Sequence, residues 1–309
     1  MPLPIYFAPL QGYTDPIYRS IHQSLVGGVE RYYAPFLRWE RGGLRNKDRR
    51  DLQQCAPAIP QIIAANPDEF CHLCDAVQQA GHKHINLNMG CPFPMQTGAG
   101  RGSALLPHPD RVEALLQEME RRQGEATFSL KMRLGLEQPN EALALLPLIN
   151  GSVVEQVIIH PRVGKQQYKG NPLHDAFSHF YQACTKPLIY NGDITTPQHI
   201  TDLQSRYPRL SGVMIGRGLL SRPSLPREYA LQEEWPLPRR LALALQMHSQ
   251  LLEHVQRHLQ GDSQQLARLR AFWEYQPDIL PPKHFKRLMK CGTMRHYLAE
   301  LALCRPNPQ

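Results

Sequence analysis

Short apolar runs recur along the first two thirds of the chain, and each is followed by a segment whose apolar residues have helical spacing. This alternation predicts parallel β-strands, because a crossover between parallel strands needs a connecting helix that covers the sheet. The predicted strands are residues 5–10, 31–36, 59–64, 84–88, 127–132, 156–160, 187–190 and 212–215. The predicted helices between them include residues 67–80, 109–122, 140–148 and 197–206.

Eight strand–helix units in about 220 residues favour a TIM (β/α)8 barrel over an open sheet. Beyond these units the pattern changes to helices without intervening strands, which is typical of a separate small bundle. The predicted tail helices are residues 239–259, 263–275 and 283–291. We therefore predict an α/β chain with a barrel domain over residues 1–232 and a C-terminal all-helical domain over residues 233–309.

Polar and ionisable side chains gather where the predicted strands end. The carboxyl ends of barrel strands meet on one face, which is where such folds have their active sites. A random distribution would scatter these residues over the helices as well, so their clustering predicts an enzyme. The residues concerned are Asn88, Cys91, Lys131, Arg133, His160, Arg162, Asn191, Asp193 and Arg217.

The overall charge narrows the class of partner. The chain of 309 residues has a formal net charge of +8, which suits a polyanion such as a nucleic acid. No apolar run is long enough for a membrane helix, and the first residues lack the basic region of a signal peptide, so we expect a cytoplasmic protein without a membrane partner. Seven irregularly spaced cysteines argue against a disulfide framework. Cys71 and Cys74 form a lone Cys-x-x-Cys pair, so we expect no metal site.

Two glycine-rich turns predict a site for a phosphorylated ligand. Residues 212–218 read Gly-Val-Met-Ile-Gly-Arg-Gly and residues 190–193 read Tyr-Asn-Gly-Asp. Such turns expose backbone N–H groups to an anion, and Arg217 adds a bidentate donor. The loops after strands 7 and 8 are the usual phosphate site of a TIM barrel. The alternative is that both are ordinary structural turns.

Lys131 lies on a strand whose alternation points it into the barrel mouth. A buried lysine without an anionic partner is destabilising or loses its proton. We therefore expect Lys131 to face a ligand on which negative charge develops, either a reduced flavin or a carbonyl substrate that forms a Schiff base. Gln61, at the third predicted strand, is placed to bond a flat heterocycle.

Cys91 lies in a tight loop, Asn-Met-Gly-Cys-Pro, at the end of the fourth predicted strand. A thiol in this position can act as a nucleophile or a proton donor, and the alternative is a packed structural cysteine. The segment that follows, residues 98–106, is rich in glycine, and we expect it to be a mobile lid.

Five motifs taken together resemble the tRNA-dihydrouridine synthases. They are residues 8–15, 88–92, 130–133, 160–162 and 213–218, and they occur in the family's order from the first predicted strand to the last. The resemblance implies an FMN-dependent enzyme that reduces the C5–C6 bond of a tRNA uridine, with NADPH, or alternatively NADH, as reductant. It implies hydride transfer from flavin N5 to C6 and protonation of C5 by Cys91. We expect tRNA as the partner and a monomeric protein.

The resemblance also implies a role for each matching residue. The flavin ring would be bordered by the backbone of Pro9, Leu10 and Gln11, bonded at its polar edge by Gln61 and Lys131, and approached by His160. The phosphate would be held by Asn191, Gly192, Asp193, Gly216 and Arg217. The flipped uracil would face Asn88 and Arg133, with Cys91 as general acid. The chain departs from the family at Leu10, where methionine is usual, and at Pro161, where glycine is usual.

Two basic segments with interspersed aromatic residues are candidates for contacts with RNA, namely residues 38–50 and the helical tail. The aromatic residues are Trp39, Trp273, Tyr275 and Phe285, and the alternative is a solvated basic face with core aromatics. The closest resemblance is to the branch that modifies position 16, through Arg38, Tyr168, Arg268, Arg270 and either Trp273 or Tyr275.

Two other functions are compatible with the pattern. A small-molecule flavin barrel, such as a dihydropyrimidine or dihydroorotate oxidoreductase, shares the phosphate loops and Lys131 but has no use for a basic helical tail. A non-catalytic RNA-binding protein with a retained barrel would bind tRNA without holding a flavin, although Cys91 and Lys131 argue against it.

Overall fold

The computed structural model describes residues 2–54 and 57–304, which form two compact units. The first unit comprises Met1–Gln11, Glu30–Ile194 and Ile200–Gly216, and the second comprises Gly12–Val29, Thr195–His199 and Arg217–Gln309. The expected domain boundary at residue 232 stays a prediction. Cys55 lies outside the described residues.

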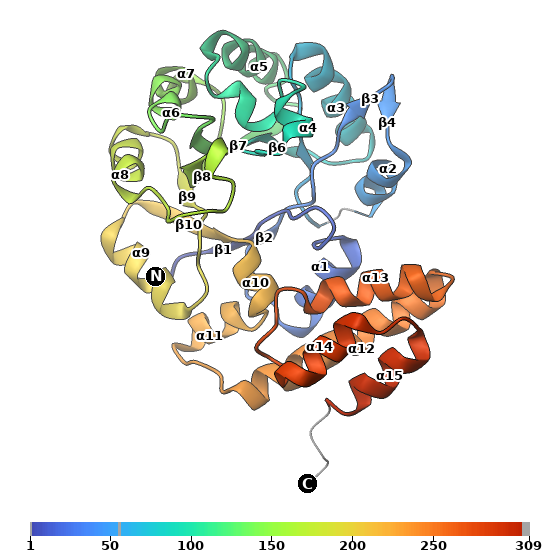
Figure 1. The fold of residues 1–309 in the computed structure, drawn as a ribbon. Coiled ribbons are helices and arrows are strands. Elements are labelled where there is room, and N and C mark those ends of the chain that lie inside the picture. Colours follow the sequence, from blue (N-terminus) through green and yellow to red (C-terminus); the bar gives the residue numbers. More distant parts are fainter. Residues whose placement is uncertain (1, 55–56, 305–309) are drawn as a thin grey trace. The chain divides into compact units, whose positions relative to one another are not determined.

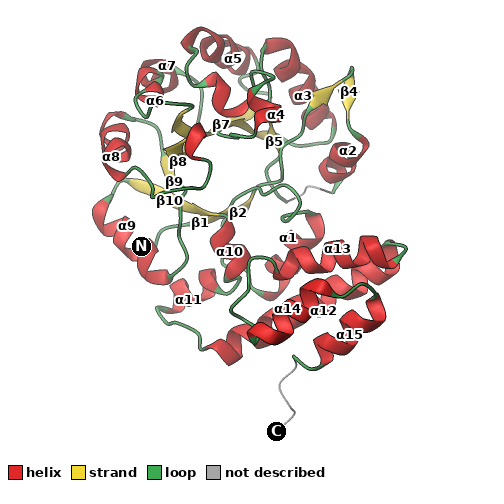
Figure 2. Ribbon diagram, viewed as in Figure 1, coloured by secondary structure: helices red, strands yellow, loops and turns green. Residues whose placement is uncertain are grey.

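Eight parallel strands form the centre of the first unit (Figures 1 and 2). Their order around the sheet is β2 (Arg31–Tyr32), β1 (Ile5–Phe7), β10 (Leu210–Ile215), β9 (Leu188–Tyr190), β8 (Gln156–Val163), β7 (Thr127–Gly135), β6 (His84–Met89) and β5 (Gln61–Ile62). The chain segments at the two edges meet through parallel bridges from Tyr33 to Ile59 and from Leu37 to Ile62. These bridges close the sheet, so the predicted TIM barrel is confirmed.

The interior of the barrel is filled by side chains that alternate along the strands. Tyr6, Ala8, Tyr33, Ile59, Ile158, Ile189 and Met214 form one buried cluster. Successive side chains of a strand point to opposite faces, so residues two positions apart point the same way. His160, Asn191 and Gly216 each follow a member of this cluster by two positions. These predicted site residues therefore face the interior of the barrel at the carboxyl ends of their strands.

Helices surround the strands of the first unit (Figure 2). They are α2 (Asn46–Gln53), α3 (Pro67–Gln79), α4 (Pro94–Thr97), α5 (Pro109–Arg121), α6 (Glu141–Ala144), α7 (Leu146–Gly151), α8 (His174–Ala183) and the short η1 (Gly102–Leu105) and η2 (Gly164–Gln166), with α9 (Pro197–Arg206) crossing the division between the units. A hairpin of β3 (Trp39–Glu40) and β4 (Gly43–Leu44) precedes α2. The prediction of one helix over residues 140–148 is wrong, because the segment divides at Leu145 into α6 and α7. Pro147 has no N–H donor, and its ring prevents a continuous helix.

In the part of the second unit that the structure describes, the secondary structure is helical, which confirms the expected helical C-terminal region. It contains α1 (Pro16–Leu25), α10 (Arg217–Ser221), α11 (Leu225–Leu231), α12 (Leu237–His258), α13 (Asp262–Trp273), α14 (Pro282–Lys290) and α15 (Met294–Ala302). Trp273 is fully buried and donates from Nε1 to the Tyr297 hydroxyl at 2.9 Å, so its predicted availability for RNA stacking is wrong. Among the residues that the structure describes, no helix combines the length and apolar character needed to cross a bilayer.

Candidate active site

Cys91 is held in place by hydrogen bonds on both sides of its loop. The Asn88 side-chain oxygen accepts from the N–H groups of Gly90 at 3.0 Å and Cys91 at 2.8 Å. The Cys91 carbonyl accepts from the Ser103 N–H at 3.0 Å and from the Ser103 hydroxyl at 3.1 Å. Because β6 ends at Met89, these bonds fix the thiol just beyond the carboxyl end of that strand.

The second half of the glycine-rich segment after Cys91 is packed against the Cys91 loop. Gly102 has a left-handed φ of +64°, and a Cβ at this position would lie 2.5 Å from the Cys91 carbonyl oxygen. Residues 101–106 are all buried. A glycine is needed at position 102 for close packing against the Cys91 backbone, whereas residues 98 and 99 are exposed. The lid over residues 98–106 stays a prediction.

Three buried amide side chains connect the barrel strands beside Cys91. Asn88 donates to Gln61 Oε1 at 2.8 Å, Gln61 donates to Asn86 Oδ1 at 2.7 Å, and Asn86 donates to Ser129 Oγ at 2.8 Å. Gln61 and Asn88 thus have partners within the protein, and this network holds the loop of Cys91 rigidly. Their predicted contacts with flavin and uracil stay predictions.

Lys131 pairs in register with Asn88 on β6 and with Ile158 on β8. Burial, and to a lesser extent the neighbouring Arg133, lower the pKa of the Lys131 ammonium to about 7, although Cys91 acts in the opposite direction. A neighbouring anion would restore the charge of the ammonium. The electron-rich edge of a flavin is a suitable partner, so this residue fits the cofactor expected from the sequence.

Arg133 connects strand β7 to two loops. Its side chain is 2% exposed and donates to the carbonyls of Gly90 and Val163, each at 2.9 Å. Its guanidinium carbon lies 5.6 Å from the centre of the Tyr168 ring, within the range of a cation–π contact. The structure thus brings Arg133, Tyr168 and the Cys91 loop together. Their predicted roles in binding the uracil and the RNA require such proximity.

The Cys91 thiol is 7% exposed. Burial raises its pKa, and this effect outweighs the opposing influence of the Phe93 backbone N–H and of the nearby cations Arg133, Lys131 and Arg38. The thiol is therefore protonated at neutral pH, which is the state that a proton donor needs. The same cations would stabilise the thiolate after the proton has left.

Arg162 joins His160 to Asp193 at the carboxyl ends of β8 and β9. Its Nη1 lies 3.1 Å from His160 Nε2 and 3.1 Å from Asp193 Oδ1, and its Nη2 forms an ion pair with the same carboxylate. Because the Asp193 carboxylate is bound by Arg162, a phosphate could be bound at Asp193 only by its backbone N–H. The sequence placed Arg162 among the polar residues at the strand ends without giving it a specific role. The His-x-Arg alternation places the side chains of His160 and Arg162 on the same face of β8.

The remaining predicted cofactor residues lie on the loops after β1, β9 and β10. Gln11, beyond β1, donates from its side chain to the Phe36 carbonyl at 3.0 Å, and Asn191 donates to the Met214 carbonyl at 2.7 Å. A Cβ on Gly216 would lie 3.4 Å from Ala8 Cβ and 3.5 Å from Leu10 Cδ1, so the loops after β10 and β1 are closely packed there. Arg217 is the first residue of α10 and belongs to the second unit. No cluster of three or more metal-ligating side chains occurs among residues 2–54 and 57–304.

Comparison with known proteins identifies the family. The family model described as dihydrouridine synthase matches residues 6–300. The chain belongs to the dihydrouridine synthase family. The resemblance noted in the sequence is thereby confirmed, and so is the expected class of enzyme, a flavin-dependent oxidoreductase acting on tRNA uridine.

Curated members of this family match over most of the chain. A probable tRNA-dihydrouridine synthase of Rickettsia prowazekii is 28% identical over 237 residues, which cover 73% of this chain and 70% of the relative. A tRNA-dihydrouridine(16) synthase of Aquipseudomonas alcaligenes is 28% identical and covers 73% of this chain and 75% of the relative. The tRNA-dihydrouridine synthase B of Pasteurella multocida is also 28% identical, with 72% and 68% covered. Since relatives of two branches are equally similar, the branch that modifies position 16 stays a prediction.

Solved structures agree on the fold. Histamine dehydrogenase from Rhizobium sp. 4-9 superposes with a TM-score of 0.56 at 10% identity, over 80% of this chain and 48% of that chain. The chain thus spans about half the length of that dehydrogenase. Morphinone reductase superposes with a TM-score of 0.51 at 9% identity, over 75% of this chain and 86% of that chain. At these identities the likeness concerns the fold alone.

Exposed apolar side chains of this family member lie on the segments that follow β6 and β8. Phe93 is 59% exposed, Met95 is 74% exposed and Tyr168 is 43% exposed. Arg38 is buried beside them, with Nη1 at 3.4 Å from Met95 Sδ and at 3.1 Å from Glu40 Oε1. The Nε atom of Arg38 is buried without a hydrogen-bond partner in the described part of the chain. Phe93 and Met95 were not predicted from the sequence, and their exposure has no sequence signal beyond their place after Cys91.

The predicted tRNA-binding residues of the tail lie together in the second unit. Arg268 forms an ion pair with Asp15 at 2.7 Å, and Tyr275 packs edge-on against Tyr13 with ring centres 4.9 Å apart. Arg268 and Arg270 are half-buried on α13. Seven cations of the tail are exposed among the residues that the structure describes: Arg239 and Arg257 on α12, Lys283, Lys286, Arg287 and Lys290 on α14, and Arg295 on α15.

Proposed function

We propose that this protein is an FMN-bearing tRNA-dihydrouridine synthase in which Cys91 is the proton donor and NADPH is the reductant. The observation that carries the proposal is a protonated thiol held rigidly by Asn88 and Ser103 near the cation Lys131. Family membership supplies the reaction class, and this arrangement supplies the groups that the class needs.

The proposed flavin contacts follow from the placement of residues at the carboxyl ends of the strands. Bound FMN would supply the hydride for uracil C6. Lys131 and Gln61 would bond its polar edge, while the backbone of residues 9–11 and His160 would border the ring. The loops after β9 and β10 would hold the phosphate through Asn191, Gly192, the backbone of Asp193, Gly216 and Arg217.

The proposed substrate contacts place one pyrimidine beside Cys91. Asn88 and Arg133 would orient the uracil, and Cys91 would donate its proton from Sγ to C5. The thiolate left behind would be stabilised by Arg133 and Lys131, which already lower the thiol pKa against the effect of burial. An unpaired uridine must leave its stack to reach this position, which costs less in a loop than in a helix.

The proposed tRNA contacts involve both units of the chain. Arg38, whose buried Nε has no partner within residues 2–54 and 57–304, and Tyr168 would contact RNA near the reacting base. Arg268, Arg270 and Tyr275 would contact it through the helical unit, where phosphate neutralisation favours binding. The choice of NADPH over NADH, the monomeric state and the modified position stay predictions.

The proposed function is tested directly with purified protein and with cells that lack the gene. The protein should contain FMN, with a flavin absorbance that NADPH removes under anaerobic conditions. Transfer RNA from the deletion strain should lack dihydrouridine at one position, and the gene alone should restore it. Well-folded protein that holds no FMN in any preparation would contradict the proposal.

The pKa of Lys131 predicts that FMN binding depends on pH. The pKa is about 7 in the folded protein and 10.5 in the unfolded chain, so the unfolded chain binds more protons between these values. The stability of the flavin-free protein should therefore rise with pH across this window. If bound FMN restores the charge, its Kd should increase by up to about tenfold per pH unit above pH 7.

Quenching of flavin fluorescence between pH 6 and 9 measures this dependence. Lys131→Met should remove it, whereas Lys83→Met, at an exposed lysine before β6, should retain it. An FMN affinity of the wild-type protein that is independent of pH would show that Lys131 does not contact the flavin.

A further inference from the structure

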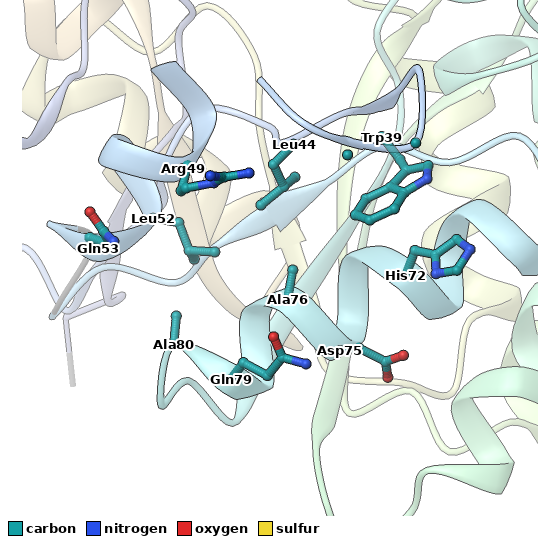
Figure 3. Close-up of a pocket in the computed structure, with 12 residues that line it drawn as sticks. Trp39, Leu44, Arg49, Leu52, Gln53, His72, Asp75, Ala76, Gln79 and Ala80 are labelled. Atoms are coloured by element: carbon teal, nitrogen blue, oxygen red, sulfur yellow. The ribbon is translucent and has the colours of Figure 1, made fainter. Parts of the chain in front are cut away.

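A groove on the outer wall of the barrel lies between the β3–β4 hairpin, α2 and α3 (Figure 3). Its volume is about 670 Å³, which is within the range of sites for small ligands. Trp39 and Leu44 from the hairpin, Arg49 from α2 and His72 from α3 contribute to its lining. It contains none of the residues assigned above to the flavin or to the reacting uracil.

An aromatic platform forms one end of the groove. The rings of Trp39 and His72 are stacked, with centres 4.6 Å apart and planes inclined by 17° (Figure 3). Trp39 is half-buried and lines the groove, so it is supported from one side and accessible from the groove. Supported aromatic rings of this kind favour stacking of unpaired bases, since every base has a planar π-face.

The charge of the groove favours an anion. Arg49 lines it and is exposed, and Lys47 and Arg50 are exposed on the same helix. The lining carboxylate of Asp75 is neutralised by Arg122, whose Nη1 lies 2.8 Å from Asp75 Oδ1. The groove therefore has an aromatic platform for a base and a cation for a phosphate, which are the two features that a single-stranded nucleotide requires.

The hairpin that carries Trp39 is also joined to the segment after Cys91. Arg101 donates from Nη2 to the Trp39 carbonyl at 3.0 Å and is held by Glu69 through bonds of 2.9 and 2.7 Å. Arg38, the residue before Trp39, contacts Met95. One rigid hairpin therefore connects the groove with the loop that carries the proposed proton donor.

We propose that this groove binds an unpaired nucleotide of the RNA substrate other than the reacting uridine. The base stacks on Trp39 and the phosphate is bound by Arg49. This inference rests on the proposed function, because it assumes that the substrate is tRNA. It assigns a second recognition site, which holds the RNA while the reacting base is inside the barrel.

The test uses the flavin-bound protein and full-length tRNA. Of the three tryptophans, Trp39 is half-buried, whereas Trp235 and Trp273 are buried. Transfer RNA should therefore quench the emission of Trp39 in the wild type. It should leave the tryptophan emission of Trp39→Phe unchanged. Trp39→Ala should raise the Kd for tRNA by on the order of tenfold. Arg49→Ala should raise the Kd several-fold and lower the slope of log Kd against log salt by about one.

Two comparison variants separate this groove from general charge effects. Arg121→Ala, at an exposed arginine of α5 outside the groove, should leave both the Kd and the slope unchanged. Arg268→Ala combined with Arg270→Ala should weaken tRNA binding and flatten its salt dependence, yet leave the quenching of Trp39 intact. Arg49 is exposed, so its variant is expected to fold even if Trp39→Ala does not.

The outcomes distinguish this inference from the proposed function. Unchanged tRNA affinity in both Trp39→Ala and Arg49→Ala, with dihydrouridine still formed, would overturn the groove assignment alone. Quenching of Trp39 by NADPH but not by tRNA would also overturn it, because the groove would then bind the reductant. Absence of FMN and of uridine reduction would refute the proposed function. Quenching of Trp39 by tRNA would in that case still show that RNA binds in the groove.

Discussion

Replacing Cys91 by alanine is expected to lower dihydrouridine formation by about two or more orders of magnitude while FMN stays bound and reducible by NADPH. The reason is that burial keeps the thiol protonated and the loop holds it rigidly, whereas alanine has no proton to give to C5. Single-turnover assays with pre-reduced protein measure this step separately from flavin reduction. The rate of flavin reduction by NADPH should be unchanged.

Cys184→Ala is the matched control for this experiment. Cys184 is also buried, and burial raises its thiol pKa as it does for Cys91, but it lies at the end of α8. Its replacement should leave dihydrouridine formation unchanged. Undiminished uridine reduction by Cys91→Ala would remove Cys91 from the reaction and leave the proposed proton donor unidentified.

The sequence predicted the barrel because its signals are local and repeated. Each of the eight apolar runs overlaps a barrel strand, although β2 and β5 are only two residues long and β7 and β8 extend three residues beyond their runs. Their shortness reflects the closure of the barrel, where single bridges at Tyr33 and Leu37 replace a continuous ladder. Such closure depends on residues distant in sequence, so the pattern of a single run cannot reveal it.

The predicted residues at the barrel mouth follow from the two-residue period of a strand. Once His160 and Asn191 are placed two positions after buried residues of the barrel interior, their direction is fixed. The partners of these side chains could not be predicted in this way. The bond between Asn88 and Gln61 joins two strands, and the packing of Gly102 against Cys91 depends on a turn that the sequence pattern suggested to be mobile.

The aromatic residues of the tail show a related limit. Trp273 and Tyr275 are two positions apart in a basic segment, and composition alone made both candidates for stacking on RNA. The structure buries Trp273 against Tyr297 and leaves Tyr275 half-buried against Tyr13. Which of two neighbouring aromatic residues faces the helical core depends on how the helices pack. The sequence of α13 separates apolar and polar residues only weakly, so it does not indicate which face is buried.

Replacing Glu228 by glutamine is expected to lower the free energy of unfolding of the helical unit by about 3–5 kcal/mol. The Glu228 side chain is fully buried and accepts from Arg222 Nε at 2.9 Å, from the Ser224 hydroxyl at 2.5 Å and from the Trp235 N–H at 2.7 Å. Glutamine would remove the buried counter-charge of Arg222 and leave only the exposed Glu234 carboxylate, 3.5 Å from Arg222 Nη2. A buried charge that loses its buried partner is strongly destabilising. Urea unfolding followed by the emission of Trp235 and Trp273 measures the loss in this unit.

The pH dependence of this effect separates charge from shape. Burial alone would raise the pKa of Glu228, but the bonds from Arg222, Ser224 and Trp235 together hold it below the model-peptide value of 4.5. A carboxyl with a lowered pKa stabilises the fold above 4.5, and this stabilisation is lost as the pH falls through the folded-state pKa. The difference between the wild type and Glu228→Gln should therefore shrink in acid. Glu253→Gln, which breaks an exposed ion pair with Arg257, should cost less than about 1 kcal/mol, and an equal cost at both positions would show that burial of the ion pair has no special importance.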